Sequence, residues 1–233
     1  MNRLAIFTEG ETEQLFAEWL VREMAGAANL HIELREARGG KSTRRRTRIV
    51  EAVADNPELK YYVLIVDCAG DGAVKSRIKE EYHNLAKYGY KALVGLRDAP
   101  KQRAEIADLQ KGLPEGVPMA PVPVVFVLAI MEIEAWFLAE HTHFPKIDAS
   151  LTPALIHAKL GFDPSTDDMR LRDRPAQDLN DAYQLVGERY QKGRAAQRTV
   201  YLLDPARIAF EMTANEPEIQ RLVDTIECFL QPE

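Results

Sequence analysis

Acidic side chains follow several short apolar runs in this sequence, and acids in such positions can support metal chemistry. In chain order they are Glu9, Glu11, Glu13, Asp67, Asp71, Asp98, Glu132 and Glu134. Two carboxylates about 5 Å apart repel each other by roughly 3 kcal/mol at an effective dielectric constant of about 20. A group of them therefore needs a bound cation or shifted pKa values, and a ligand set made only of oxygen selects Mg²⁺ or Mn²⁺ over zinc.

The apolar runs before these acids have the composition of strands in a parallel sheet. Strands are predicted at 3–7, 30–37, 61–66, 90–96 and 124–130. The run 30–37 alternates apolar and polar residues, which is typical of a half-buried strand. Helical periodicity occupies the segments between the strands, at 15–24, 42–55, 74–89, 101–111 and 132–141. This alternation predicts an α/β fold with a mostly parallel, Rossmann-like sheet flanked by helices.

In an open α/β sheet, functional groups gather at the carboxyl ends of the strands. The acids that follow the predicted strands are then expected on one edge of the sheet, where they would face one another across a cation. The alternative is that each acid complements a helix dipole or forms a turn, and that the acids never meet.

The chain changes character after about residue 145, where the strand patterns stop. The remaining segments with helical patterns lie at 152–161, 176–193, 204–212 and 216–230. We therefore predict an α/β domain at 1–145 and a C-terminal helical lobe at 146–233.

Composition limits the classes of protein to consider. Hydrophobic residues make up 46 % and charged residues 28 % of the 233 residues, and the net charge is −6. An acidic chain of this kind does not coat nucleic acid over its whole surface, so any such contact must be local. Two distant cysteines, no visible signal peptide and no apolar run near the roughly 20 residues of a membrane span predict a cytoplasmic protein without a membrane partner.

A basic stretch, GGKSTRRRTR at 39–48, stands out in this acidic chain. Its cations are Lys41, Arg44, Arg45, Arg46 and Arg48. At the start of the helix predicted over 42–55, they could hold nucleic-acid phosphates; the alternative is a solvated helix face paired with acids elsewhere. The GGKST letters do not form a P-loop, because that pattern requires glycine where Arg35 stands.

Three short motifs give the sequence a family resemblance. They are Glu9-Gly10-x-Thr12-Glu13 after the first strand, an acidic turn after the strand at 61–66, and Glu134-Ala135-Trp136. Together they resemble the Toprim fold and, more closely, the OLD-type (overcoming lysogenisation defect) nucleases and their small Toprim-like relatives. The resemblance covers residues 1–140 and extends only loosely into the helical lobe.

The resemblance implies roles for individual residues. Glu9 and Glu13 correspond to the Toprim glutamate and the second acid after it, and Glu134 to a later acidic ligand. Asp67 corresponds to the first aspartate of the D-x-D motif. The sequence departs from that motif, because Ala69 stands where the second aspartate belongs. Two further residues take roles on the same basis: Asp71 as a substitute ligand and Lys192 as the lysine that stabilises transition-state charge.

The implied function is a Mg²⁺- or Mn²⁺-dependent nuclease that hydrolyses phosphodiester bonds, with DNA slightly favoured over RNA. Small relatives often accompany a separate ATPase in bacterial defence against phage, and a homo-oligomer is compatible with this expectation. The main alternative is a non-catalytic Toprim-like binding or regulatory subunit of an ATPase complex. A metal-dependent phosphatase is less favoured, because such enzymes generally start from an aspartate after the first strand and this chain has Glu9.

Overall fold

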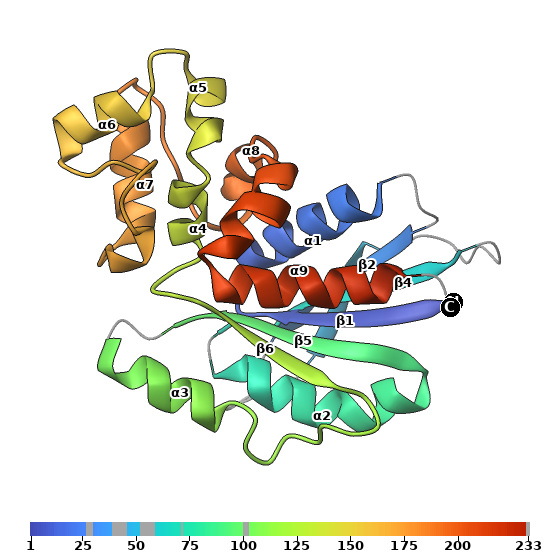
Figure 1. Cartoon of the computed structure of the whole chain (residues 1–233). Coiled ribbons are helices and arrows are strands. Elements are labelled where there is room, and N and C mark those ends of the chain that lie inside the picture. Colours follow the sequence, from blue (N-terminus) through green and yellow to red (C-terminus); the bar gives the residue numbers. More distant parts are fainter. Residues whose placement is uncertain (27–29, 39–45, 52–58, 71, 100–102, 232–233) are drawn as a thin grey trace.

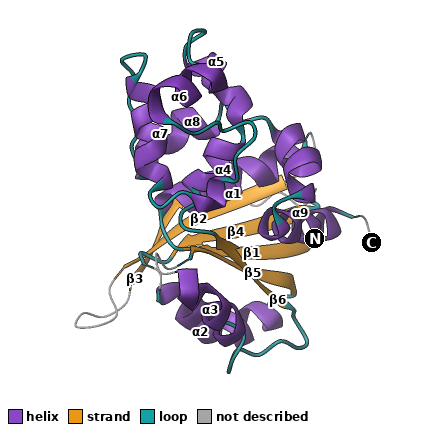
Figure 2. Cartoon of the chain, turned by 60° about the vertical axis from the view of Figure 1, so that its left-hand side comes forward, coloured by secondary structure: helices purple, strands orange, loops and turns teal. Residues whose placement is uncertain are grey.

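The computed structural model of the chain describes residues 1–26, 30–38, 46–51, 59–70, 72–99 and 103–231. Its centre is a six-stranded sheet with the strand order β3-β2-β4-β1-β5-β6. The strands are β1 (Asn2–Thr8), β2 (Leu30–Arg38), β3 (Arg46–Glu51), β4 (Tyr61–Asp67), β5 (Tyr90–Asp98) and β6 (Val124–Ala129). Neighbouring strands are parallel except β2 and β3 (Figure 2). The predicted α/β fold with a mostly parallel sheet flanked by helices is confirmed.

Strand β3 corrects the sequence prediction. A helix was expected over 42–55, but the described part of that segment pairs antiparallel with β2, with Glu36 opposite Arg48 and Ala37 opposite Thr47. The segment RTRIVE contains three β-branched residues, which favour an extended strand. The row of arginines suggested the outer face of a helix, but alternate arginines fit the polar face of an edge strand equally well.

Helices cover both faces of the sheet (Figure 1). On one face lie α1 (Glu11–Ala25) and α9 (Pro217–Leu230), and on the other lie α2 (Ala73–Lys87) and α3 (Ile106–Gly112). Strand β1 is buried on both sides, so that Leu4 and Ile6 belong to one apolar core and Ala5 and Phe7 to the other. Helix α2 approaches β5 closely at Gly95, where an added Cβ atom would lie 2.9 Å from the Ile78 side chain.

The remaining helices stand above the α1 side of the sheet in Figure 1. They are α4 (Glu134–Ala139), α5 (Phe144–Ile147), α6 (Pro153–Leu160), α7 (Pro175–Gln184) and α8 (Gln197–Val200). Short 3₁₀ or π turns lie at 103–105, 141–143, 169–171, 193–196, 207–211 and 212–214. Each helix of the described ranges is too short or too polar to cross a lipid bilayer.

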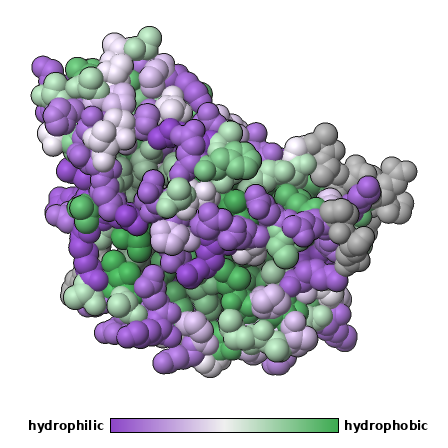
Figure 3. Space-filling view, in the orientation of Figure 1, coloured by the Kyte–Doolittle hydropathy of each residue, from purple (hydrophilic) through white to green (hydrophobic). Residues whose placement is uncertain are grey.

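Helix α9 returns to the sheet after the helical lobe. The Leu128 backbone N donates to Glu218 Oε2 at 2.9 Å, and the Tyr61 hydroxyl donates to the Leu230 carbonyl at 2.8 Å. The last helix of the predicted lobe therefore packs on strands of the predicted α/β domain. Between α9, α3 and the edge strand β6 lies a groove of about 580 Å³, in a region where Figure 3 shows hydrophobic residues at the surface.

Candidate active site at the carboxyl edge of the sheet

The carboxyl ends of β1, β5 and β6 bring several acids together. Glu9 follows β1, and its Oε2 accepts a hydrogen bond of 3.1 Å from the backbone N of Asp98 at the end of β5. Asp98 Oδ1 in turn accepts one of 2.8 Å from the backbone N of Ile133, in the turn between β6 and α4. Glu13 lies in the first turn of α1 and is only 5 % exposed. These bonds fix the Glu9 and Asp98 carboxylates at one edge of the sheet.

Lys192 lies at the centre of this acidic group. Its Nζ is 3.0 Å from Glu132 Oε1, 3.2 Å from Glu134 Oε2 and 3.9 Å from Asp98 Oδ2. The lysine follows α7 in a segment that is not helical, although the sequence predicts a helix over 176–193. The helix ends at Gln184, and a Gly187 residue with φ +81° helps turn the chain back toward the sheet.

Glu134 is the most deeply buried acid of the group. It begins α4 with no solvent exposure, and its Oε1 accepts a hydrogen bond of 2.6 Å from the Tyr190 hydroxyl. Among the described residues, its Oε2 has no hydrogen-bond partner and is balanced only by the charge of Lys192. Glu132 Oε2 accepts a bond of 3.0 Å from the Ala176 backbone N, which ties the helical lobe to the site.

Burial and mutual repulsion shift the pKa values of these acids. Burial raises the pKa of Glu13 to about 7, with repulsion from Glu134 adding to the shift and Lys192 opposing it. Burial, followed by Glu13 and Glu134, raises the pKa of Asp98 well above its ordinary value. Burial also raises the pKa of Glu134, against the opposing effects of Lys192 and Tyr190. The charged forms of these three carboxylates are therefore disfavoured in the folded chain, even with the Lys192 ammonium beside them.

The structure brings four of the residues predicted for the site to this edge, namely Glu9, Glu13, Glu134 and Lys192. Asp67 ends β4, on the other side of β1 from Asp98, and its Oδ1 accepts a hydrogen bond of 2.8 Å from the backbone N of Ala69. Asp71 lies outside the described residues.

The predicted nucleic-acid-binding cations fall mostly outside the described part of the chain. This applies to Lys41, Arg44 and Arg45. Arg46 begins β3, and Arg48 is exposed on the same strand. The helix that was expected to present these arginines is replaced by an edge strand, while their role in binding phosphates stays a prediction.

Two acids and a tyrosine belong to the site although the family resemblance assigned them no role there. Asp98 and Glu132 were recognisable as acids after strands, and that position was the available signal. Tyr190 had no such signal, because it bonds a residue 56 positions away in the chain. Only the placement of the helical lobe over the sheet edge brings it there.

The chemical type of the possible ligand atoms at this edge suits a hard divalent cation. They are carboxylate oxygens, and one of them, Glu134 Oε2, is buried without a hydrogen bond from the described residues. No three acidic, histidine or cysteine side chains of the described part of the chain converge as a ready-made ligand set. The Lys192 ammonium instead lies among three of the carboxylates, in the kind of position that a bound cation would take.

Comparison of the chain with known protein families, with curated proteins and with solved structures found no significant match. The likeness to Toprim and OLD-type proteins therefore rests on the short motifs around Glu9, Asp67 and Glu134.

Proposed function

We propose that this protein is a Mg²⁺- or Mn²⁺-dependent nuclease that hydrolyses phosphodiester bonds at the carboxyl edge of its sheet. The observation that carries the proposal is the gathering of buried and partly buried carboxylates around Lys192 at this edge. Carboxylates whose pKa values are shifted by burial and by nearby charges cluster at functional sites.

The residues at the edge divide between holding a cation and handling the substrate. Glu13, Asp98 and Glu134 are the carboxylates that would supply oxygen ligands to the metal, although they do not converge as a ready-made set. A bound metal would supply charge neutralisation and a water of lowered pKa. Glu9, whose carboxylate accepts a hydrogen bond from the Asp98 backbone N, would accept the proton of the attacking water as a general base. The Lys192 ammonium would stabilise the negative charge that builds on the phosphate oxygens in the transition state.

Charge explains why such a site would depend on metal. Within the described residues, five carboxylates lie at the edge, and Lys192 pairs with three of them. A nucleic-acid phosphate would be repelled by this excess of negative charge at close range. Neutralisation of these carboxylates by a bound divalent cation would allow the phosphate to approach the edge.

A second function is favoured by two specific observations. Ala69 replaces the second aspartate of the D-x-D motif, and Lys192 already pairs with carboxylates that a metal would use. Both fit a non-catalytic binding or regulatory subunit of an ATPase complex. In either case the motif resemblance suggests a cytoplasmic bacterial protein, a separate ATPase partner and a role in defence against phage.

The proposed activity is tested by incubating plasmid DNA and a structured RNA with the protein in Mg²⁺ or Mn²⁺. Glu134→Gln should lower the cleavage rate by about 100-fold or more, a loss on the scale of removing one preorganised electrostatic group from an active site. Glu11→Gln is the matched control, because Glu11 lies in the same turn as Glu13 but pairs with Arg194 on the surface. We expect cleavage of DNA to exceed that of RNA.

Two results would reject the nuclease. The first is that neither DNA nor RNA is cut with either metal. The second is that Glu134→Gln cuts as fast as the unmodified protein. In the first case, the non-catalytic subunit becomes the preferred function. Where cleavage is observed, an Asp67→Ala variant shows whether the motif aspartate matters: loss of cleavage assigns Asp67 to the reaction, and full activity removes it from the ligand set.

A further inference from the structure

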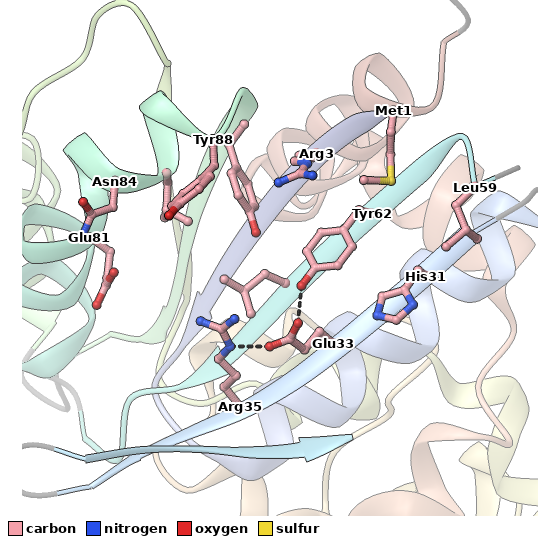
Figure 4. A pocket seen from close by; sticks show the side chains of 13 residues that line it. Met1, Arg3, His31, Glu33, Arg35, Leu59, Tyr62, Glu81, Asn84 and Tyr88 are labelled. Carbon is pink, nitrogen blue, oxygen red and sulfur yellow. Dashed lines mark hydrogen bonds and ion pairs between the residues drawn. The ribbon is translucent and has the colours of Figure 1, made fainter. Parts of the chain in front are cut away.

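A cavity of about 510 Å³ lies between the sheet and α2, on the half of the sheet near the amino ends of its strands (Figure 4). Arg3, Tyr62 and Tyr90 come from the first two residues of β1, β4 and β5. His31, Glu33 and Arg35 alternate along β2 and form the polar face of that half-buried strand. The volume is within the range of roughly 300–1,000 Å³ that small-molecule sites occupy.

Polar groups line a sheet face where apolar side chains normally pack. His31 is 5 % exposed and Glu33 is 8 % exposed. Burial alone would raise the pKa of Glu33, but hydrogen bonds from Tyr62 and Arg35 outweigh that effect and hold the pKa below its ordinary value. The Glu33 carboxylate is thus held in its charged form by two donors. Burying any one of these three polar groups without its partners would lower the stability of the protein.

Two guanidinium groups reach toward this cavity with donors to spare (Figure 4). Arg35 uses Nε to bond Glu33, and its terminal nitrogens point away from that carboxylate. The Arg3 guanidinium carbon lies 5.6 Å from the centre of the Tyr62 ring, and within the described part of the chain no carboxylate pairs with it. Guanidinium groups with available paired N–H donors recognise phosphate and carboxylate groups.

Aromatic rings make up much of the rest of the wall. The His31 and Tyr62 rings are stacked, with centroids 5.0 Å apart and planes 5° from parallel, and Tyr90 meets Tyr62 edge-on. These three rings pack against one another. Tyr88, from the end of α2, is different: it lines the cavity and is 64 % exposed, so a face of its ring is available at the rim. An accessible aromatic ring is a stacking partner for a nucleobase.

We propose that this cavity binds a nucleoside monophosphate, with the phosphate between Arg3 and Arg35 and the base against Tyr88. The two arginines supply anion recognition, Tyr88 supplies a stacking surface, and the neutral Asn84 amide on the cavity wall can bond a base edge. The site is separate from the acids at the carboxyl edge. It therefore does not depend on the proposed nuclease activity.

The test is calorimetric titration of the full chain with adenosine, guanosine, cytidine and uridine monophosphates. A metal chelator is present throughout, so that binding at the acidic edge does not contribute. The corresponding nucleosides and inorganic phosphate are titrated separately. We expect saturable binding of at least one monophosphate, with an affinity at least about 10-fold higher than that of its nucleoside or of phosphate, because charged hydrogen bonds and stacking each contribute at least about 1 kcal/mol.

Variants locate the binding. Arg3→Ala should weaken it about 10-fold or more, and Tyr88→Ala about 5-fold or more. Arg35→Lys keeps a cation beside Glu33 but removes the paired donors, and should also weaken binding about 10-fold. Lys87→Ala is the matched control, because it removes an exposed cation from the same end of α2 without touching the cavity. Its affinity should match that of the unmodified protein.

The proposal is overturned by any of three results: no saturable binding of the four monophosphates at millimolar concentration, equal affinity for inorganic phosphate, or full affinity in both Arg3→Ala and Tyr88→Ala. Arg3 and Tyr88 are not buried, so their loss should leave the thermal unfolding temperature nearly unchanged. That measurement separates lost binding from lost folding.

Discussion

The acidic edge and the cavity beside α2 both bury charged groups, but they balance that charge in opposite ways. At the edge, the described carboxylates outnumber the Lys192 ammonium that pairs with them, and the pKa values of Glu13, Asp98 and Glu134 are raised. In the cavity, Glu33 is paired by Arg35 and Tyr62, and its pKa is lowered.

The difference separates two kinds of polar site. A carboxylate with a raised pKa is held in a place that disfavours its charge, and a cation from outside can relieve that cost. A carboxylate with a lowered pKa is already stabilised by its neighbours, and it helps to position them instead. The edge is therefore suited to binding a cation, whereas the cavity presents two arginines to an anion.

The largest expected effect on stability concerns Glu13 in the metal-free protein. Its pKa is about 7 in the folded chain, above its ordinary value, so the folded state binds more protons than the unfolded state. The stability linked to Glu13 is present in full at low pH and is lost as the pH rises through about 7. The loss is at most about 3 kcal/mol for a shift of this size.

Urea unfolding in a metal chelator, measured from pH 5 to pH 8, checks this prediction. Glu13→Gln should flatten the fall in the free energy of unfolding and should be more stable than the unmodified protein at pH 8. Glu11→Gln, in the same helical turn, should keep the original pH dependence. If the free energy of unfolding of Glu13→Gln fell with pH as steeply as that of the unmodified protein, the Glu13 carboxylate would not be the source of the pH dependence.

A smaller effect of opposite sign is expected in the cavity. Glu33→Gln keeps the shape of the side chain but removes the charge that pairs with Arg35. Leaving a buried charged partner poorly satisfied should lower the free energy of unfolding by about 1–3 kcal/mol at pH 8. Glu115→Gln, an exposed carboxylate elsewhere, serves as control. A neutral or stabilising effect of Glu33→Gln would remove the distinction between the two regions.

Local patterns in the sequence were enough to predict most of the sheet. The apolar runs that became β1, β4, β5 and β6 are buried by neighbours on both faces, so their composition alone marks them as buried strands. Strand β3 was missed because it is an edge strand, stabilised by pairing with β2 rather than by an apolar pattern of its own.

The sequence predicts those residues of the acidic edge that follow the ends of strands. It does not predict the contacts that the helical lobe contributes. Glu9, Asp98 and Glu134 follow from their places after strands in a parallel sheet. Tyr190 and the contacts of Lys192 depend on how the chain turns after α7 and packs across α4, which no local pattern encodes. The roles of Asp67 and of the basic stretch around Arg48 stay predictions from motif and composition.

The most direct test of the central claim is titration of the protein with Mn²⁺, followed by electron paramagnetic resonance of the unbound ion. The account predicts at least one bound ion per chain. Its affinity should fall about 10-fold or more in Glu134→Gln, because even a partner outside the ligand set contributes to metal affinity on that scale, and should stay unchanged in Glu33→Gln. Absence of binding at millimolar Mn²⁺, or binding that is equally strong in Glu134→Gln, would contradict a cation site at the carboxyl edge.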